Sequence, residues 1–252
     1  MVSNRYKFSF PHIHFTKIDS TNKYLRENLS NISPLHGFMA ISDFQTEGKG
    51  QYGRIWESDS QKNILCTTVL DCSFLQIDQI FGLHLIAAIS VYELIKKYVN
   101  SNIKIKWPND IYIDDKKCAG ILIENVLKSN HLQWSLFGIG INVFQERFNS
   151  AEFATSMQLN TTSTLSLQDL IIELREALLL NYEKLKQGQF QNLLVFYNSV
   201  LYKANEEVVF EDKSSQSWTG IVRNVSADGR LNLDKNKCLI SINYGDYIWK
   251  KF

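Results

Sequence analysis

Residues 45–56 combine the residue types that an anion-binding loop requires. Three glycines permit positive φ angles and let a ligand approach the backbone closely. Runs of backbone N–H groups together with two cations suit phosphate or carboxylate oxygens. These residues are Gly48, Gly50, Gly53, Lys49 and Arg54. Because such a loop loses much conformational entropy and buries little surface, we favour a ligand site, with a plain surface turn as the alternative.

The same glycines spell Gly-x-Gly-x-x-Gly, the fingerprint of dinucleotide-binding folds. That fingerprint requires a strand before it and a helix that opens on the last glycine. Residues 38–44 suit a strand, but residues 57–63 are polar without period and residues 64–70 suit a second strand. No Gly-Lys-Ser/Thr closes the loop, so a P-loop is excluded as well. The pattern therefore predicts a phosphate-handling loop between two strands.

Two further polar stretches lie where predicted elements begin or end. The stretch Asp-Ser-Thr-Asn at residues 19–22 precedes a predicted helix, and either Asp19 or Ser20 is a good N-cap. The functional alternative is that its spare hydroxyl and N–H groups face a ligand carbonyl. Pro108 interrupts an alternating strand pattern, which predicts a bulge or a bend, with a plain turn as the alternative. A bulge would direct Asn109 and Asp110 away from the sheet, where Asp110 can hold a magnesium ion or an amine.

Lys117 and Asn142 stand at the ends of two predicted strands. Lys117 lies where a hairpin turn enters an apolar strand, and a solvated lysine is the alternative to a functional one. Asn142 ends a strand over residues 131–143, whose glycines at alternate positions weaken it unless something packs against that face. The Asn142 amide can donate and accept hydrogen bonds, which suits the edge of an adenine or a structural turn.

The periodicity of the chain predicts an α/β domain followed by a small β domain. Apolar spacing indicates helices at residues 23–29, 79–99, 166–188 and 190–201, among strands at 12–18, 38–44, 64–70, 103–107, 111–115, 118–124 and 131–143. After Ala204 the chain changes to about five short alternating strands, with Asp228-Gly229 as a hairpin signal. This texture predicts a small β-barrel-like domain, with residues 1–203 and 204–252 as the two domains.

Composition narrows the function classes. The formal net charge is +1 and the cations do not cluster, so nucleic-acid binding is not expected. No Cys-x-x-Cys occurs, which predicts buried free thiols in a reducing cytoplasm at Cys66, Cys72, Cys118 and Cys238. The five histidines share no metal-ligand spacing. The N-terminus lacks the apolar core of a signal peptide, and we expect no membrane-spanning run.

Five blocks in a fixed order resemble the biotin–protein ligases. They are Asp19-Ser-Thr-Asn22, Gln45-x-x-Gly48-Lys-Gly-x-x-Gly-Arg-x-Trp56, Lys106-Trp-Pro-Asn-Asp110, Lys117-x-Ala-Gly-Ile-Leu-x-Glu124 and Gly138-Ile-Gly-Ile-Asn142. The resemblance implies an α/β (α+β) catalytic domain, a mixed sheet with flanking helices like that of class II aminoacyl-tRNA synthetases. It also implies an SH3-like barrel after that domain. The first block begins near His14, so we expect no N-terminal helix-turn-helix module.

The resemblance implies a two-step reaction. The biotin carboxylate attacks the α-phosphate of Mg·ATP to give biotinyl-5′-AMP, and a lysine of a biotin carboxyl carrier domain then attacks the mixed anhydride. Because the first step brings two anions together, cations and N–H donors must offset their repulsion. The implied cofactors are ATP and Mg²⁺, and the implied partners are the carrier domain and a second copy of the chain in a homodimer.

The resemblance also assigns roles to residues. Lys117, Arg54 and Asp110 would be catalytic, with Lys117 bridging the biotin carboxylate and the α-phosphate and Asp110 placing magnesium or the amine. Biotin contacts are implied for Ser20, Thr21, Asn22, Gln45, Gly48, Lys49, Lys117 and Gly120. Nucleotide contacts are implied for Lys49, Gly50, Gln51, Gly53, Arg54, Trp56, Asn109 and Asn142, with Trp56 and Asn142 at the adenine.

The chain departs from the family pattern at three places. Arginine is frequent in the family where Lys49 and Gln51 stand, and lysine lacks the bidentate fork while glutamine lacks the charge. The last strand ends without arginine, which leaves Lys250 or Lys251 as substitutes for a nucleotide contact. Two alternatives remain open: a lipoate–protein ligase, whose pocket would be long and apolar, and a non-catalytic ligand-binding protein.

Overall fold

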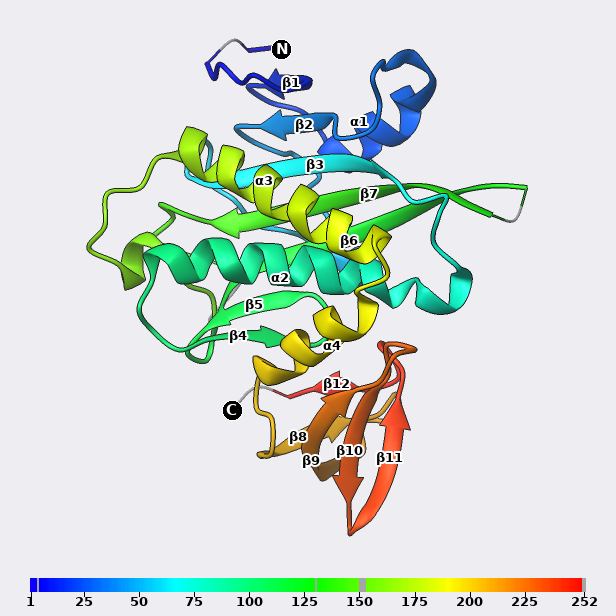
Figure 1. The fold of residues 1–252 in the computed structure, drawn as a ribbon. Helices are drawn as coiled ribbons and strands as arrows, with labels where there is room; N and C mark the ends of the chain where they lie inside the picture. Colours follow the sequence, from blue (N-terminus) through cyan, green and yellow to red (C-terminus); the bar gives the residue numbers. More distant parts are fainter. Residues whose placement is uncertain (4, 130, 150–152, 251–252) are drawn as a thin grey trace.

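The computed structural model describes residues 1–3, 5–129, 131–149 and 153–250. Its centre is a mixed sheet in the order β1-β2-β3-β7-β6-β5-β4 (Figure 1). β1 and β2 pair in parallel, and the remaining neighbours in the sheet pair antiparallel. The strands are β1 (His12–Phe15), β2 (Met39–Ser42), β3 (Asn63–Asp71), β4 (Ile103–Lys106), β5 (Asp110–Ile113), β6 (Lys116–Lys128) and β7 (His131–Asn142). The predicted mixed sheet is confirmed.

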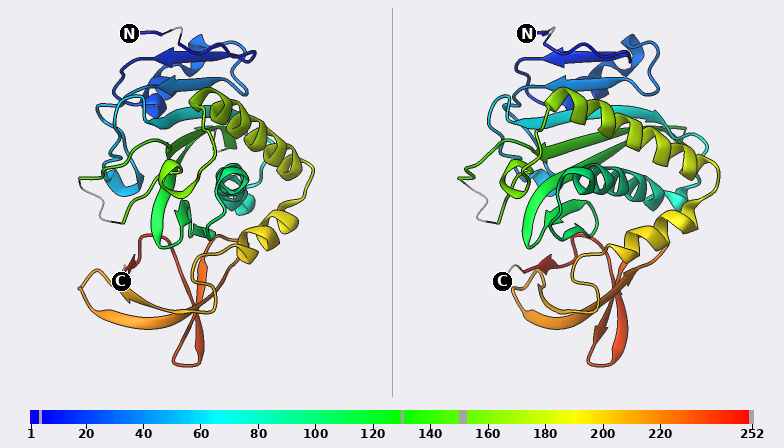
Figure 2. Two further views of the ribbon diagram at one scale, coloured as in Figure 1. Left: turned by 90° about the vertical axis from the view of Figure 1, so that its left-hand side faces the viewer. Right: turned by 60° about the vertical axis from the view of Figure 1, so that its left-hand side comes forward.

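Strand alternation divides the core between the two faces of this sheet. Ile41, Leu70 and Phe137 are buried in the main cluster with α2 (Phe81–Tyr98) and α3 (Leu167–Lys186). Their chain neighbours Ala40, Val69 and Leu136 form a second cluster with Leu25 of α1 (Thr21–Asn28). Because successive strand residues point to opposite faces, α1 covers one face, while α2 and α3 cover the other (Figure 2). Burying each large apolar side chain stabilises this arrangement by roughly 1.5–3 kcal/mol.

The helices begin within two residues of their predicted starts. The Ser20 side chain caps α1 by accepting a hydrogen bond from the Lys23 backbone N–H, and Ser166 caps α3 through that of Asp169. We expected no apolar segment long enough to span a membrane, and this expectation is wrong. The segment Ile77–Tyr98 is long and apolar enough to span a bilayer, judged by length and composition alone. However, 61% of its apolar window is buried inside the fold, as expected of a core helix.

A second, antiparallel sheet follows α4 (Phe190–Ser199) in the order β11-β10-β9-β8-β12. Its strands are β8 (Glu207–Glu211), β9 (Ser217–Val225), β10 (Leu231–Lys235), β11 (Cys238–Ile242) and β12 (Ile248–Trp249). The chain between the sheets is tied to β4, since Ile105 N donates to Val200 O at 3.0 Å and Tyr202 N to Ile105 O at 2.8 Å. The five predicted strands are confirmed, while the SH3-like assignment and the boundary at 203/204 stay predictions.

Two local predictions need correction. Pro108 does not interrupt a continuing strand: it lies in the turn between β4 and β5, which pair antiparallel, so the alternative of a plain turn is the right one. Cys66, Cys72 and Cys118 are buried free thiols as expected, but Cys238 is exposed. Cys238 begins β11, which lies at the edge of its sheet and is mostly exposed. Few side chains of this strand therefore pack against a core.

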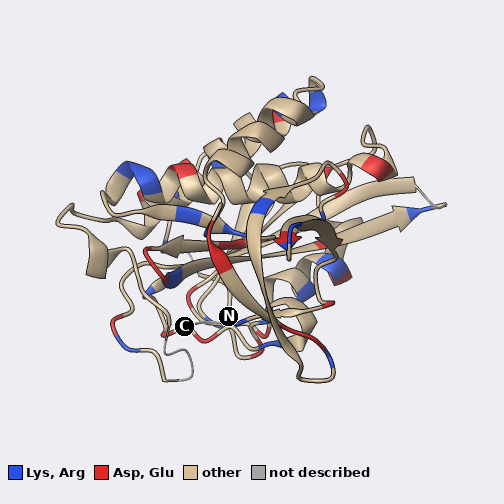
Figure 3. Cartoon of the chain, turned by 90° about the horizontal axis from the view of Figure 1, so that it is seen from below, with Lys and Arg blue, Asp and Glu red and all other residues tan. Residues whose placement is uncertain are grey.

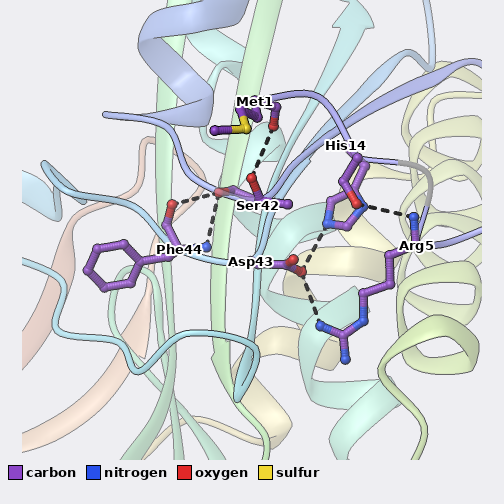
Figure 4. Close-up of polar contacts among 8 residues, drawn as sticks. Met1, Arg5, His14, Ser42, Asp43 and Phe44 are labelled. Atoms are coloured by element: carbon purple, nitrogen blue, oxygen red, sulfur yellow. Dashed lines mark hydrogen bonds and ion pairs between the residues drawn. The ribbon is translucent and has the colours of Figure 1, made fainter.

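A polar network holds the end of β2 just before the glycine-rich loop (Figure 4). Burial lowers the pKa of His14 below its usual value. Its Nε2–H donates to Asp43 Oδ1 at 3.0 Å, because a carboxylate oxygen can only accept. Arg5 Nη1 also reaches Asp43 Oδ1, at 3.5 Å. Ser42 Oγ donates to Phe44 O at 2.7 Å. These bonds fix the strand end from which Gln45 follows.

His84 of α2 makes stability depend on pH. Its ring lies 5.8 Å from that of Phe81, and burial lowers its pKa from 6.5 to about 4. Because the unfolded chain binds this proton first, the stabilisation is complete above pH 6.5 and declines as pH falls towards 4. Between pH 7.5 and pH 5, His84→Gln should lose about 2 kcal/mol less unfolding free energy than the wild type in urea titrations. Equal losses in the two proteins would contradict this.

Candidate active site

Glycines make a floor without side chains on the α1 face of the sheet. Gly120 and Gly140 are direct partners in the β6–β7 ladder, and Gly138 lies two residues before Gly140. A Cβ atom at Gly140 would come within 2.6 Å of the Trp56 ring, and one at Gly138 within 2.2 Å of Asn22 Oδ1. The missing side chains therefore allow the glycine-rich loop and the start of α1 to lie directly on the strands. This explains the alternate glycines noted in the sequence.

The glycine-rich loop lies between β2 and β3, as predicted. It folds back on itself as a short hairpin in which Gly50 N donates to Arg54 O at 2.7 Å and Trp56 N to Gly48 O at 2.9 Å. The 3-10 turn η2 (Gln51–Gly53) forms its tip. Lys49 and Arg54 are exposed on this hairpin, so both cations are available to a ligand.

A contact joins the loop tip to the C-terminal sheet. Tyr52 has a left-handed backbone with φ of 55°, and its hydroxyl donates to Tyr244 O at 2.9 Å. Tyr244 lies between β11 and β12, and its ring also contacts Trp107 with centroids 5.4 Å apart. The loop tip and the turn before β5 are therefore both held against the same residue of the C-terminal sheet.

One cavity of about 260 Å³ collects the candidate residues. It is lined by Ser20, Thr21, Asn22, Gln45, Lys49, Gly50, Gln51, Arg54, Trp56, Asn109, Asp110, Lys117, Gly120 and Asn142. Gly48 and Gly53 were predicted as well but do not line it. Gly48 O instead accepts the closing bond of the hairpin, and Gly53 supplies a φ of +72° at its tip.

The sequence interpretation missed other residues of the cavity wall. Glu57, Cys66, Phe148, Phe153 and Tyr244 line the cavity together with the candidates. Glu57 directly follows the glycine-rich motif, so its position in the sequence could have identified it as a residue of the site. Tyr244 comes from the other sheet and is far from every motif in sequence, so no spacing could have identified it.

Lys117 and Asp110 form an ion pair in this cavity. Their Nζ and Oδ1 atoms are 2.7 Å apart, and the Nζ lies 5.3 Å from the Trp56 ring centroid. The Lys117 backbone is held by bonds to Phe153 O and from Thr155 N. The β5–β6 register shifts between Ile111 and Tyr112, which places a bulge beside the pair. Bulges aim side chains away from the regular pleat, so the ammonium group is directed into the cavity by the backbone.

Asn109 and Asn142, two of the three asparagines that line the cavity, differ in which amide atoms have partners. Asn109 Nδ2 donates to Ile121 O, so this amide mainly holds the turn against β6. Asn142 Nδ2 donates to Thr155 O at 3.0 Å. Its Oδ1 is buried and has no hydrogen-bond partner among the described residues. Asn142 can therefore offer a ligand the acceptor Oδ1.

Three polar atoms in the cavity wall are buried without a partner in the described part of the chain. They are the acceptors Gln51 Oε1 and Asn142 Oδ1 and the donor Trp56 Nε1. A buried polar atom without a hydrogen bond costs about 1–3 kcal/mol, so a group of them at one place needs an explanation. Their convergence on one cavity indicates that a bound molecule supplies the missing donors and acceptor.

The model of the Biotin/lipoate A/B protein ligase family matches residues 14–142, just over half of the 252 residues. The chain belongs to this family. The matched segment contains the glycine-rich loop, Lys117 and the glycine floor.

Similar proteins in this ligase family carry biotin ligase names. The bifunctional ligase/repressor BirA of Escherichia coli is 31% identical over 175 residues, covering 64% of this chain and 51% of that protein. The chain spans 39% to 51% of the lengths of the four BirA relatives it matches. The biotin–[acetyl-CoA-carboxylase] ligase of Mycobacterium tuberculosis is 24% identical, with 91% of this chain and 85% of that protein covered. Biotin protein ligase from Aquifex aeolicus, solved with biotin and ATP, superposes with a TM-score of 0.81 and 25% identity over 97% of this chain and 100% of that one.

The cavity of this ligase-family member offers limited support for a metal ion. Among the described residues, Asp110 and Glu57 are the carboxylates that line it, and no group of three His, Cys, Asp or Glu side chains could hold a metal. Mg²⁺ commonly uses one or two carboxylates and completes its shell with waters and substrate phosphates. The residues therefore fit a magnesium ion carried by a nucleotide.

Lys250, one of the two lysines predicted as substitutes, does not line the main cavity. Lys250 Nζ pairs with Glu211 at 2.7 Å and lines a separate cavity of about 80 Å³. Lys251 lies outside the described residues. The residue that this sheet contributes to the main cavity is Tyr244.

Proposed function

We propose that this chain is an ATP-dependent biotin–protein ligase, which forms biotinyl-5′-AMP and transfers biotin to a lysine of a biotin carboxyl carrier domain. The observation that carries the proposal is the single cavity that combines three cations with three unpartnered polar atoms. Lys49, Arg54 and Lys117 can balance the charges of a carboxylate and a phosphate brought together. The relatives named for biotin ligation support the same activity.

Biotin is favoured over lipoate by the polar end of the cavity. Ser20, Thr21 and Gln45 line it beside the start of α1. A cyclic urea carries N–H and C=O groups that can hydrogen-bond to such side chains, whereas a dithiolane ring has neither. The lipoate alternative therefore fits these residues less well.

In the first step, a biotin carboxylate oxygen bonds to the α-phosphorus of ATP, and the bond from that phosphorus to the bridging oxygen breaks to release pyrophosphate. Lys117 extends from the sheet and Lys49 and Arg54 from the loop opposite, so cations flank the cavity. Magnesium bound to the nucleotide would add charge neutralisation, with Asp110 as its protein ligand.

In the second step, the carrier lysine nitrogen bonds to the acyl carbon, and the bond from that carbon to the AMP oxygen breaks. The nitrogen loses a proton as the amide forms. Asp110 lines the cavity, so its carboxylate can help to place the incoming lysine side chain.

Exchange of labelled pyrophosphate into ATP tests this function. The chain should catalyse exchange when biotin is added and not with lipoate or without an acid. Exchange with lipoate alone would establish the lipoate ligase, and no exchange with either acid would favour a non-catalytic binding protein.

Gln51 should limit how long the adenylate is retained. Its Oε1 is buried at the cavity without a partner, and a neutral hydrogen bond contributes about 1 kcal/mol against roughly 1.5–3 for a charged one. Gln51→Arg should therefore slow release of preformed biotinyl-adenylate by about tenfold in a single-turnover assay without carrier. The control Gln187→Arg adds the same charge on the exposed end of α3. Equal or faster release from Gln51→Arg would show that another residue closes the loop.

The proposed setting is cytoplasmic, with a carrier domain as the macromolecular substrate and a homodimer as the assembly. Basic and acidic residues are interspersed in the view of Figure 3, and the formal net charge is +1. We therefore propose no binding of duplex DNA at physiological salt. Light scattering would decide the oligomeric state.

A further inference from the structure

A continuous chain of close polar contacts runs from Gln45 at the cavity to Arg26 on the outside of α1. Thr67, at its centre, is completely buried and was not among the candidate site residues. At the cavity end, Gln45 Oε1 lies 2.8 Å from Thr21 N and 3.0 Å from Thr21 Oγ1. Thr67 Oγ1 then lies 2.7 Å from Thr21 Oγ1 and 2.5 Å from Asn22 Oδ1. At the outer end, Asn22 Nδ2 donates to Glu124 Oε2 at 2.7 Å, and Arg26 Nη2 donates to Glu124 Oε1.

Chemistry fixes the orientation of both amides in this chain. The Thr21 backbone N–H can only donate, so the Gln45 amide must present its oxygen there. The Glu124 carboxylate can only accept, so the Asn22 amide presents its nitrogen to Glu124 and its oxygen to Thr67. Because an Arg26 donor occupies the other Glu124 oxygen, that carboxylate is held in place.

The chain is consequently one proton short. Three oxygen–oxygen gaps separate Gln45 from Asn22, but only the hydroxyls of Thr21 and Thr67 carry protons to fill them. The gaps of 2.5 and 2.7 Å match proton-bearing O–H···O bonds, while the gap of 3.0 Å between Thr21 and Gln45 is the longest. Thr21 Oγ1 and Gln45 Oε1 therefore face each other as two acceptors, and both residues line the cavity.

We propose that Glu124, held by Arg26, is a positioning residue that sets this proton polarity and so makes the cavity select an acid whose head group carries N–H donors. This inference rests on the proposed function. A cyclic urea brings two N–H groups to such acceptors, whereas a dithiolane ring brings none. Glu124 thereby determines which of the two acids of the family is bound, although it does not line the cavity.

The isosteric substitution Glu124→Gln should reverse the direction in which the hydroxyl and amide groups of this chain donate. In Glu124→Gln, Arg26 still requires the oxygen of the new amide, so its nitrogen faces Asn22 Nδ2 and two donors meet. Asn22 then turns its amide and donates to Thr67. The Thr67 proton moves to Thr21 and the Thr21 proton to Gln45, so all three gaps are filled. Gln45 Oε1 then accepts two protein bonds and keeps no lone pair for a ligand.

Removing Arg26 in the same background should undo the effect. Without the guanidinium, the new glutamine is free to turn and present its oxygen to Asn22, which restores the original orientation. Arg26→Ala alone leaves the Glu124 carboxylate as an acceptor and should change little. The two substitutions are therefore non-additive, with the second compensating the first.

The test is the dissociation constant of biotin, measured by calorimetry without ATP for the wild type, both single variants and the double variant. Glu124→Gln should weaken biotin binding by about tenfold or more, Arg26→Ala by less than about twofold, and the double variant should recover to within about threefold of the wild type. In all four proteins the dissociation constant of ATP should stay within about twofold of the wild-type value, and the melting temperature within about 3 °C of it. The ATP and melting controls separate altered polarity from general damage.

Wild-type affinity from Glu124→Gln would overturn the inference and leave the proposed function intact. A double variant as weak as Glu124→Gln would also overturn it, since simple structural loss at this position predicts no recovery. Absence of biotin binding by the wild type would instead remove the proposed function, and this inference with it.

Discussion

Replacing Lys117 with alanine is expected to slow biotin-dependent adenylation by about 10²–10³-fold, the usual effect of removing one preorganised group that stabilises transition-state charge. The Lys117 ammonium lies 2.7 Å from Asp110 and 5.3 Å from the Trp56 ring centroid, in the cavity proposed to bind the two anions. Alanine keeps the backbone bonds to Phe153 and Thr155. The unfolding free energy should therefore change by less than about 1 kcal/mol.

Lys116→Ala is the matched control, because it removes the same charge from the neighbouring, exposed position of β6. Pyrophosphate exchange and urea unfolding should be measured on both variants. Adenylation by Lys117→Ala near the wild-type rate would show that the role assigned to this lysine is wrong. A large loss in Lys116→Ala would point to the charge of the strand rather than to the position of one ammonium group.

Substitutions at two glycines of the cavity floor, Gly138 and Gly140, should affect biotin binding and nucleotide binding differently. A Cβ at Gly138 would lie 2.2 Å from Asn22 Oδ1, so Gly138→Ala must displace Asn22 and break its bonds to Thr67 and Glu124. Because Asn22 lines the cavity, its displacement should weaken biotin binding by about tenfold or more, the equivalent of one hydrogen bond. Overpacking should also reduce the unfolding free energy by about 1–3 kcal/mol.

Gly140→Ala is the complementary variant. Its Cβ would lie 2.6 Å from the Trp56 ring and away from Asn22, so retention of the nucleotide should weaken more than binding of biotin. Calorimetric titrations of biotin and ATP into both variants would measure the division. Unchanged biotin affinity in Gly138→Ala, or equal losses of both ligands in both variants, would contradict a floor divided in this way.

Periodicity and capping residues were sufficient to predict the elements of this fold. The apolar run of β3 and the Ser166 cap correspond directly to structure, because each depends on neighbours in sequence. The turn at Pro108 could not be distinguished from a bulge, since the choice depends on strand pairing. The exposure of Cys238 likewise follows from the edge position of β11, which the sequence does not record.

The candidate site was predictable where motifs crowd many polar residues into a few positions. The glycine-rich loop and the block around Lys117 were found in this way, and they line one cavity. Tyr244 and Thr67 carried no signal, because single residues of common types become neighbours of the site only through tertiary packing. Lys250 was the wrong candidate, because its ammonium group pairs with Glu211 and its side chain lines a separate cavity.

The most direct test of the proposed activity is the mass of a biotin carboxyl carrier domain after incubation with this protein. The expected result is a gain of one biotinyl group on a single lysine, only when both ATP and biotin are present, with one AMP released per group transferred. No gain with biotin and ATP, or a lipoyl group gained from lipoate in its place, would contradict the account.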